Sequence, residues 1–327
     1  MTSRARLEAA VQGRKADRPA FGFWYHFRPL DWFPPALREE YCEERPDDLA
    51  IYVEQMPKAT LEFWHRYRPD LLKVMHDAPY ESSGIASAED WRQLRRLGPT
   101  QGNFGAHLEV LRQIRAGLPN DVPMIETVFN AQYYANKLCG KRLSEHLRDH
   151  PEAVAEGISV IYDNLEAYAR EAIKITDGIY FAVNGASEDT GDPDTYKRYF
   201  QERDRRLLES ASSAPFNVLH LHGYGELYGE LVADMPAAIY CWSDRASNLS
   251  LSQGSAMFKR CVMGGINEMR LPEYGRREIA TEAADALHQE TPYGFVLAPG
   301  CAVATDAPED CLRAIGEIAS ELLSEEN

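Results

Sequence analysis

The 327-residue chain lacks the features that mark several large classes of protein. It has no apolar run near the ~20 residues that a membrane-spanning helix needs. Its first residues carry no apolar signal segment, and none of its six cysteines is spaced as CxxC. No GxGxxG follows the first predicted strand. These absences argue against a transmembrane protein, a disulfide-rich secreted domain and a dinucleotide-binding domain, and they predict a cytoplasmic protein with reduced cysteines.

Basic residues are scarce relative to acidic ones. The chain has 35 lysines and arginines against 51 aspartates and glutamates, which gives a formal net charge of −16. The negative electrostatic potential of such a charge repels nucleic-acid phosphates and anionic lipid, so neither nucleic acid nor a membrane surface is an expected partner. A small-molecule substrate is expected instead.

The composition is otherwise that of a folded globular protein, with 44% hydrophobic and 26% charged residues. Eight short runs have the apolar and β-branched content of buried strands, and helix-like segments lie between them. The predicted strands are Ala20–His26, Leu71–His76, Val122–Phe129, Gly178–Val183, Asn217–Leu221, Ala237–Trp242, Arg260–Gly264 and Gly294–Ala298. The predicted helices include Pro46–Tyr67, Ser144–Ile175, Asp194–Ser212, Arg276–Gln289 and Pro308–Leu323.

This alternation predicts a single (β/α)8 TIM-like barrel domain over residues 1–327, with residues 1–18 forming an N-terminal helix that leads into the barrel. The length suits one α/β barrel. Several of the strand runs are continuously apolar, as expected for parallel strands that are buried on both faces. A doubly wound open sheet is the structural alternative.

In a barrel of this kind the chemistry lies at the carboxyl ends of the strands. Two of these strand ends carry, beside a glycine, side chains that can bind a metal ion. Because side chains alternate along a strand, His220 and His222 point to the same side, and Cys301 follows the last strand. Two imidazoles and a thiol with an open fourth position are the pattern of a catalytic zinc site. The alternative is a hydrogen-bonded histidine pair next to an unrelated thiol.

Other predicted strand ends and the loops after them also carry polar or aromatic side chains. These further candidates are Trp24, His26, Asp77, Tyr80, Asn130, Asn184, Glu188 and Trp242. His26 also fits a histidine that is hydrogen-bonded to the backbone, and Asp77 fits the cap of the turn that follows it. Asn184 and Glu188 also fit solvated loop residues.

Five segments along the chain share their order and spacing with a known family. They are Arg4–Gly13 with Asp17–Pro19, Pro69–Asp77, His220–Gly223, Gly264–Asn267, and Pro299–Cys301 with Ala307–Leu312. Over nearly its whole length the sequence thereby resembles the uroporphyrinogen decarboxylase superfamily. That superfamily includes porphyrinogen decarboxylases and zinc-dependent methyltransferases that act with corrinoid proteins and thiols. The resemblance implies a distorted (β/α)8 barrel and a homodimer.

The segment after the first predicted strand separates two branches of this superfamily. True uroporphyrinogen decarboxylases carry arginines there that grip the carboxylates of the substrate. Residues 26–35 contain one arginine, Arg28, among aromatic residues and prolines. The methyltransferase branch has a His-x-Cys-Gly segment and a later Gly-Cys as zinc ligands. His220 and Cys301 match these ligands, whereas His222 stands where the branch has cysteine; imidazole also binds zinc.

The resemblance to the methyltransferase branch implies zinc-dependent methyl transfer between a small methylated substrate or a corrinoid and a thiol or cobalamin acceptor. A partner protein would carry the corrinoid, and His220, His222 and Cys301 would hold Zn²⁺. Catalytic roles fall to His26, Asp77 and Asn184, and substrate contacts to Trp24, Tyr80, Asn130, Glu188 and Trp242. One alternative is metal-free decarboxylation of uroporphyrinogen or another carboxylated small molecule, with Asp77 stabilising a protonated pyrrole-like intermediate. The other is a non-catalytic binding protein on the same barrel.

Overall fold

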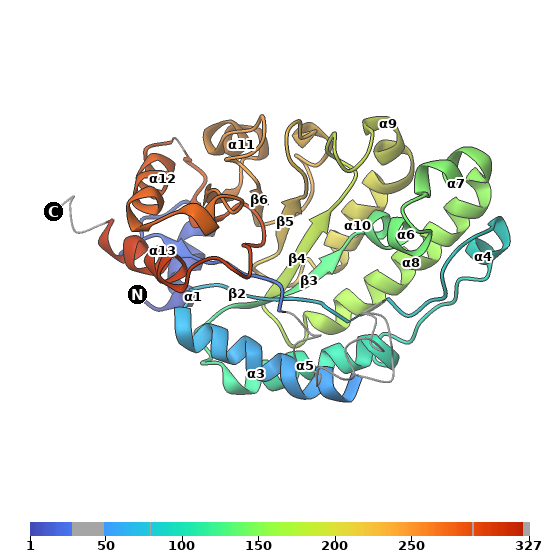
Figure 1. The fold of residues 1–327 in the computed structure, drawn as a ribbon, viewed down its shortest axis with the longest axis horizontal. Coiled ribbons are helices and arrows are strands. Elements are labelled where there is room, and N and C mark those ends of the chain that lie inside the picture. The colour runs from blue at the N-terminus through green and yellow to red at the C-terminus, as the bar shows by residue number, and fades with distance from the viewer. Residues whose placement is uncertain (28–48, 79, 290, 323–327) are drawn as a thin grey trace.

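The computed structural model describes residues 1–27, 49–78, 80–289 and 291–322. Its centre is one curled sheet of eight parallel strands, paired in the order β1-β8-β7-β6-β5-β4-β3-β2 (Figure 1). The strands are β1 Ala20–Phe21, β2 Leu72–Val74, β3 Met124–Phe129, β4 Gly178–Val183, β5 Val218–Leu221, β6 Ile239–Trp242, β7 Cys261–Ile266 and β8 Phe295–Pro299. Each overlaps a predicted strand, which confirms a parallel α/β architecture consistent with a TIM-like barrel, whereas closure of the barrel between β1 and β2 stays a prediction.

The first strand is shorter than the predicted range Ala20–His26, and a proline explains why. Ala20 and Phe21 pair with β8, and the Gly22 amide still donates to the Leu297 carbonyl at 3.1 Å. The next residue of β8 that faces β1 is Pro299, which has no N–H to continue the ladder. The chain beyond this point is therefore free to leave the sheet and approach the rim.

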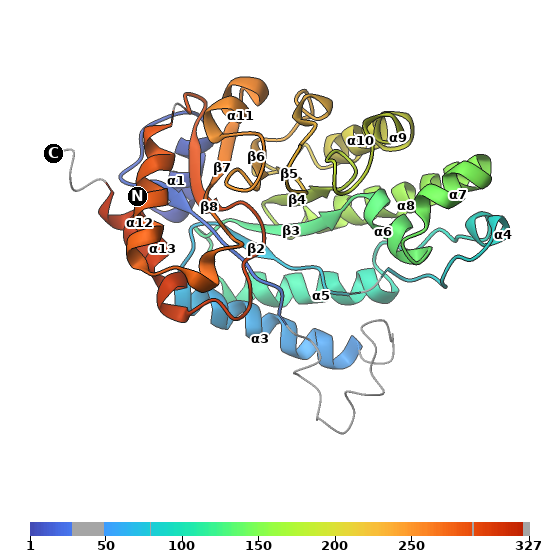
Figure 2. The ribbon, with the colours of Figure 1, turned by 45° about the horizontal axis from the view of Figure 1, so that its top comes forward.

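The helices occupy the connections between the strands. Their bounds are α1 Ser3–Val11, α3 Leu49–Tyr67, α4 Ala88–Arg92, α5 Gly102–Gly117, α6 Ala131–Leu138, α7 Leu143–Asp149, α8 Pro151–Ala172, α9 Pro193–Tyr196, α10 Glu202–Ser210, α11 Leu251–Phe258, α12 Arg276–His288 and α13 Glu309–Glu321. A π-helical turn, Lys197–Gln201, joins α9 to α10. Helices α3 and α5 lie side by side along one flank of the sheet (Figure 2). No described helix is both long and apolar enough to span a bilayer.

The prediction of one helix over Ser144–Ile175 is wrong. The segment forms α7 and α8, which are separated at His150 with φ −142° and ψ 52°. A proline disfavours helical geometry in the residue before it and suits the first position of a helix, so Pro151 ends one helix and starts the next. The predicted residues 46–48 and Leu323, at the ends of two other helices, and Arg28 in residues 28–35 lie outside the described residues.

The strand register separates the two faces of the sheet. His220 of β5 pairs with Ala182 of β4 and Cys241 of β6, so these side chains share one face. Glu126 of β3 pairs with Ile179, which lies three residues before Ala182 on β4 and therefore points to the opposite face. That second face packs against α5 and α8. The predicted site accordingly lies on the inner face of the curled sheet.

A buried carboxylate anchors the N-terminal helix to the start of the strands. Asp70, only 1% exposed, accepts hydrogen bonds from Arg6, Arg18, the Ser3 hydroxyl and the Phe21 amide. The amide of Asp70 in turn donates to the Phe21 carbonyl at 2.9 Å. One residue thus holds α1, β1 and the entry to β2 together at the end of the sheet opposite the candidate site.

Candidate metal centre

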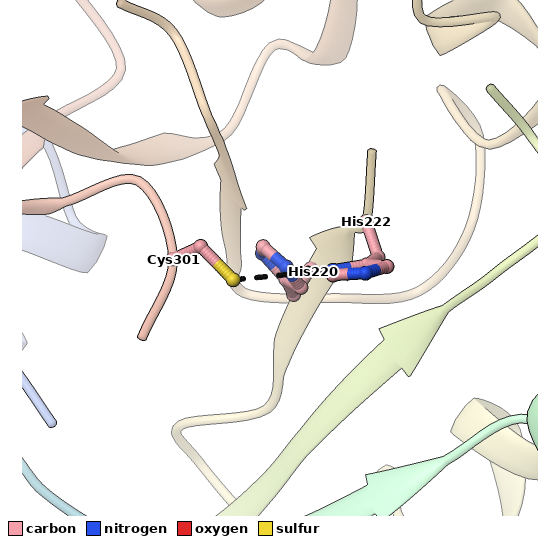
Figure 3. Close-up of side chains that lie close together, drawn as sticks. All are labelled: His220, His222 and Cys301. Atoms are coloured by element: carbon pink, nitrogen blue, oxygen red, sulfur yellow. Dashed lines mark hydrogen bonds between the residues drawn. The ribbon is translucent and has the colours of Figure 1, made fainter. Parts of the chain in front are cut away.

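Three predicted ligands converge on the inner face. His220 lies in β5, His222 immediately after it, and Cys301 just beyond β8 (Figure 3). The His220 Nε2 atom lies 3.4 Å from His222 Nδ1, and Cys301 Sγ lies 3.9 Å from the same Nδ1. One ligand atom from each of the three residues lies within 4.8 Å of the other two. Residues about 80 positions apart in sequence therefore form one compact donor set.

Two glycines make this approach possible. Gly223 has φ +142°, and a Cβ there would lie 2.2 Å from the Ser187 Oγ, whose hydroxyl donates to the His222 carbonyl. At Gly300 a Cβ would lie 2.5 Å from backbone atoms at the end of β6. The absence of a side chain at Gly300 lets the chain after β8 pass close to β6 and brings Cys301 to the histidines.

The spacing of the donor atoms fits a metal better than it fits hydrogen bonds. Tetrahedral zinc with its usual bond lengths separates two nitrogen ligands by ~3.3 Å and a nitrogen from a sulfur by ~3.6 Å. The observed separations are 3.4 and 3.9 Å, and a 3.4 Å nitrogen–nitrogen contact is long for a hydrogen bond. These two separations are close to those of a zinc site, and the third donor pair lies within 4.8 Å, so the three residues fit Zn²⁺ as a set of ligands.

Burial sets the protonation of the three donors. Desolvation, followed by the charges of His222 and Lys73, lowers the pKa of His220 well below its usual value. Desolvation also lowers the pKa of His222. Burial, reinforced by the charge of Glu268, raises the pKa of Cys301 to about 11. The imidazoles are thus neutral near pH 7 and ready to bind a metal, whereas binding at the thiol would release a proton.

A second cluster of potential ligands, His76, His107 and Glu126, lies on the helix-facing side of the sheet. Its members are joined to one another by hydrogen bonds. Glu126 accepts from His76 Nδ1 at 2.7 Å, from His107 Nε2 at 3.0 Å and from the Tyr168 hydroxyl at 2.8 Å. The remaining His107 nitrogen bonds the Tyr52 hydroxyl at 2.6 Å. Because these contacts are short, we assign the cluster a structural role.

His26 and Asp77 lie together at the same rim as the donor set. The His26 Nδ1 atom is 3.2 Å from Asp77 Oδ1, and the His26 side chain is 55% exposed. Desolvation is the main cause of the lowered pKa of His222, and the charge of His26 adds to it. Asp77 Oδ2 is buried without a hydrogen-bond partner among the described residues. The pair therefore offers one exposed imidazole and one unsatisfied carboxylate oxygen beside the candidate metal centre.

Aromatic rings form the floor of the site. The ring of Tyr180 stacks on His220 with centroids 5.2 Å apart, and Trp24 meets Tyr180 edge-on at 4.9 Å. Trp24 is only 3% exposed. Trp24 therefore packs behind the ring that stacks on His220, and its predicted contact with substrate stays a prediction.

The remaining predicted residues have other partners. Trp242 is fully buried, and its indole N–H donates to the Leu249 carbonyl. The Tyr80 hydroxyl accepts a hydrogen bond from Asn164, and Tyr80 lines a separate cavity of 970 Å³. Glu188 is exposed, and its amide donates to the Glu226 carbonyl. These side chains do not converge on the histidines.

Asn130 and Asn184 lie at the ends of neighbouring strands. The Asn130 side chain caps α6 through the Tyr133 amide and donates to the Asn184 carbonyl and to Asp204. Asn130 is fully buried, whereas Asn184 is partly exposed. The structure thus gives Asn130 an internal role in holding the end of β3, and the contacts predicted for both residues with substrate stay predictions.

The network around Asp204 leads to a testable pH dependence. Burial raises the pKa of Asp204 to about 7, against the lowering effects of its donors Tyr162, Asn130 and Tyr196. Between these pH values the folded protein therefore holds a proton on Asp204 that the unfolded chain has lost. The contribution of this proton to the free energy of unfolding declines as the pH rises from about 4 to about 7. The Asp204→Asn variant lacks this titration. We expect the stability difference between wild type and variant, from urea unfolding, to fall by up to about 1.4 kcal/mol per pH unit in that window. A constant difference would contradict the assignment.

Two residues near the metal centre were not anticipated. Glu268 is 2% exposed; its Oε1 accepts from the Ser243 hydroxyl, and its Oε2 has no hydrogen-bond partner in the described part of the chain. Lys73 is 5% exposed and lies over the rings of Trp24 and Tyr180. Lys73 was detectable as a single charge inside the apolar run from Leu71 to Met75. Glu268 follows a strand, where polar residues are common, so its sequence carried no distinguishing signal.

Fold and site together define an α/β enzyme scaffold whose candidate centre lies at the carboxyl ends of parallel strands. Comparison with known families identifies the scaffold. Residues 54–322 match the family described as uroporphyrinogen decarboxylase (URO-D), and the chain belongs to that family. This confirms the resemblance seen in the sequence. Comparison with curated protein sequences gives no match.

Solved structures reproduce the fold over almost the entire chain. A methyltransferase from Methanosarcina mazei has a TM-score of 0.77 and 17% identity, and the match covers 98% of this chain and 99% of that one. A Listeria monocytogenes protein described as a candidate vitamin-B12-independent methionine synthase has a TM-score of 0.57 and 13% identity, covering 93% and 96% of the two chains. At these identities the likeness establishes the shared fold.

Proposed function

We propose that this protein is a zinc-dependent methyltransferase. His220, His222 and Cys301 would hold Zn²⁺, and a methyl group would pass between a small methylated substrate or a corrinoid and a thiol or cobalamin acceptor. A corrinoid, where used, would be carried by a partner protein. The observation that carries the proposal is the convergence of these three donors at distances that suit zinc.

Family membership and fold also support the proposal of a methyltransferase. The chain belongs to the uroporphyrinogen decarboxylase family, and its fold matches a protein described as a methyltransferase along nearly its whole length. The convergence of the donors also argues against a barrel used only for binding, since such a protein has no need of a clustered two-histidine, one-cysteine set.

Each part of the site has a distinct task in this proposal. Bound zinc would lower the pKa of a thiol in its open position and thereby favour the nucleophilic thiolate. The stacked ring of Tyr180 holds the His220 imidazole in place. His26 and Asp77 lie at the rim, where they would orient the substrate through the exposed imidazole and the unpaired Oδ2 atom. His220 is buried, whereas His222 and Cys301 are partly exposed, so an acceptor could reach the open position from the rim.

The direct test is the metal content and activity of the purified protein. After expression with adequate zinc, we expect about one zinc per chain by elemental analysis. The loaded protein should also demethylate methylcobalamin in the presence of a thiol, which is followed by the change in cobalamin absorbance. His222→Ala should lose most of both signals, because it removes the central donor of the set.

His65→Ala is the matched control, since it removes an exposed histidine on α3. It should retain zinc and activity. A native protein with far less than one zinc per chain would refute the metal centre, whereas a zinc-loaded protein without methyl transfer would refute only the reaction.

Decarboxylation without a metal is the second candidate, favoured by the buried, unpaired Oδ2 of Asp77. An unsatisfied carboxylate oxygen could stabilise a protonated pyrrole-like group. The net charge of −16 and the single arginine in residues 26–35 are a poor match for a polyanionic porphyrinogen. We therefore expect no conversion of uroporphyrinogen to coproporphyrinogen; its detection would establish this second function.

A further inference from the structure

A pocket among the outer helices gathers cationic side chains in a chain whose formal net charge is −16. Helices α8 and α10 pack against each other (Figure 1), and a cavity of 220 Å³ lies between α8 and the segment that runs from the π-helical turn into α10. Its charged lining residues are four cations and one carboxylate, namely Lys197, Arg198, Arg203, Arg206 and Glu202. Because the chain as a whole is acidic, this local excess of positive charge indicates affinity for an anion.

The three arginines of the pocket have no carboxylate partner among the residues that the structure describes. The Arg198 guanidinium group lies over the Tyr199 ring, 5.1 Å from its centre. Arg203 donates to the Ser159 hydroxyl at 3.0 Å. A ring face and a hydroxyl leave most of the five N–H donors of a guanidinium group unused. These side chains can therefore bind an anion without first breaking an ion pair.

The single carboxylate of the pocket does not neutralise these arginines. Glu202 Oε2 lies 3.6 Å from Nε of Arg205, a residue that does not line the pocket. The remaining cation, Lys197, lies 3.9 Å from Asp194, whose side chain is 93% exposed. Exposed ion pairs of this kind contribute little. The positive charge of the pocket is therefore largely uncompensated by the described residues.

The π-helical turn Lys197–Gln201 aligns the arginines along one edge of the helix. Hydrogen bonds in a π-helix join residues five apart, so Arg198 lies about one turn before Arg203. Arg206 follows three residues later and is a neighbour of Arg203 on the same side. Turns of this type are rare, and they occur frequently at functional sites. The irregular turn and the unpaired charges thus coincide at one place.

The residues beside Arg203 are held in place by hydrogen bonds. The Arg203 guanidinium group lies 6.0 Å from the centre of the Tyr162 ring. The Tyr162 hydroxyl donates to the buried Asp204 at 2.5 Å and lies 3.4 Å from the Phe200 carbonyl in the π-helical turn. Phe200 is itself 1% exposed and lines the pocket. A site whose wall is ordered in advance loses less conformational freedom when a ligand binds.

We propose that this pocket binds the phosphate group of a small phosphorylated molecule. A phosphate monoester carries a charge of about −1.5 to −2 at neutral pH and offers three strong acceptor oxygens, which suits three unpaired guanidinium groups. A carboxylate has one charge and two oxygens in a plane, and it would satisfy fewer of these donors. The volume of 220 Å³ lies below the range of about 300–1,000 Å³ that drug-sized ligands occupy, so the molecule is compact.

Calorimetry on the full-length protein at constant ionic strength tests the proposal with three ligands. They are inorganic phosphate, phenyl phosphate and acetate. We expect dissociation constants of about 0.1–1 mM for the two phosphates and binding at least about 10-fold weaker for acetate. Phenyl phosphate should bind at least as tightly as inorganic phosphate, because Tyr199 and Phe200 can contact its carbon atoms.

Variants assign the binding to the pocket. Arg203→Gln and Arg206→Gln should each weaken phosphate binding by about 10- to 100-fold, because each removes a charge-assisted hydrogen bond. Arg206 is exposed, so its replacement leaves the packing of the helices intact. Arg170→Gln is the matched control, since it removes an exposed arginine of α8 that pairs with Glu166 and does not line the pocket. It should keep the native affinity.

Several results would overturn the proposal. One is a native protein that binds acetate as tightly as phosphate, or that binds neither phosphate below about 10 mM. Exclusion of phenyl phosphate, or native phosphate affinity in both pocket variants, would do the same. None of the candidate metal ligands lines this pocket, so the zinc content should be equal in all the variants and the two proposals stand or fall separately.

Discussion

Replacing Cys301 by alanine should weaken zinc binding by about 10²- to 10³-fold. Structural zinc sites with four ligands have apparent binding free energies of about 10–16 kcal/mol, so one ligand contributes on the order of 3–4 kcal/mol. Cys301 supplies the only thiol and the only negative charge in the set with His220 and His222. The affinity is measured by competition with a chromophoric chelator at fixed pH, since metal binding at the thiol releases a proton.

Cys139→Ala is the control for this experiment. Cys139 is also a buried free thiol, but it follows α6 and its Sγ contacts the Asn136 carbonyl. Its removal should leave zinc affinity unchanged. Equal affinities for native protein and the Cys301 variant would show that zinc, if bound, is held elsewhere.

Replacing Glu126 by glutamine should lower the free energy of unfolding by about 3–5 kcal/mol, with a fall in Tm of roughly 5–10 °C. Glu126 is fully buried and accepts from three donors, on His76, His107 and Tyr168. Glutamine keeps the shape but places an N–H₂ group against at least one of these donors and removes the charge. Denaturant unfolding and calorimetry would measure the loss.

Glu62→Gln is the surface control, since Glu62 is 69% exposed and pairs only with Arg66. It should change stability by less than about 0.5 kcal/mol. The two histidines hold the pKa of Glu126 at about 2, although burial alone would raise it. The stabilisation from the ionised carboxylate is therefore present above about pH 4.5 and is lost as the pH falls towards 2. A loss under about 1 kcal/mol at neutral pH would contradict the network's structural role.

The sequence predicted the features that repeat or alternate locally. Buried parallel strands are continuously apolar, which made all eight detectable. The spacing of His220 and His222 placed both imidazoles on one face, and Cys301 was recognised as a thiol at the end of another strand. The same alternation, applied with the ladder register, also explains why Trp242 is in the core. It follows the inward-facing Cys241 and therefore points to the helices, where it contacts Phe258.

The features that escaped prediction depend on partners far away in sequence. Glu126 meets His76 and His107 only because β2, β3 and α5 pack together. Lys73 lies against the Tyr180 ring of β4, and its charge acts on Cys301, which follows β8. Pairings of this kind have no local periodicity, so only the tertiary arrangement reveals them. The ends of β1 and β2 were overestimated for a related reason, because apolar content continues after the ladder has ended.

The pairing of β1 with β8 has a consequence for the order in which the chain folds. Ala20 pairs with Val296 and Phe21 with Leu297, so the first strand of the described residues joins the last of them. The Phe21 carbonyl can accept from the Asp70 amide early in synthesis, but the ladder between β1 and β8 forms only after β8 has been made, and such distant contacts form slowly. A nascent chain or a fragment that stops before β8 leaves that edge unpaired, and it is the species on which aggregation and chaperone capture should act.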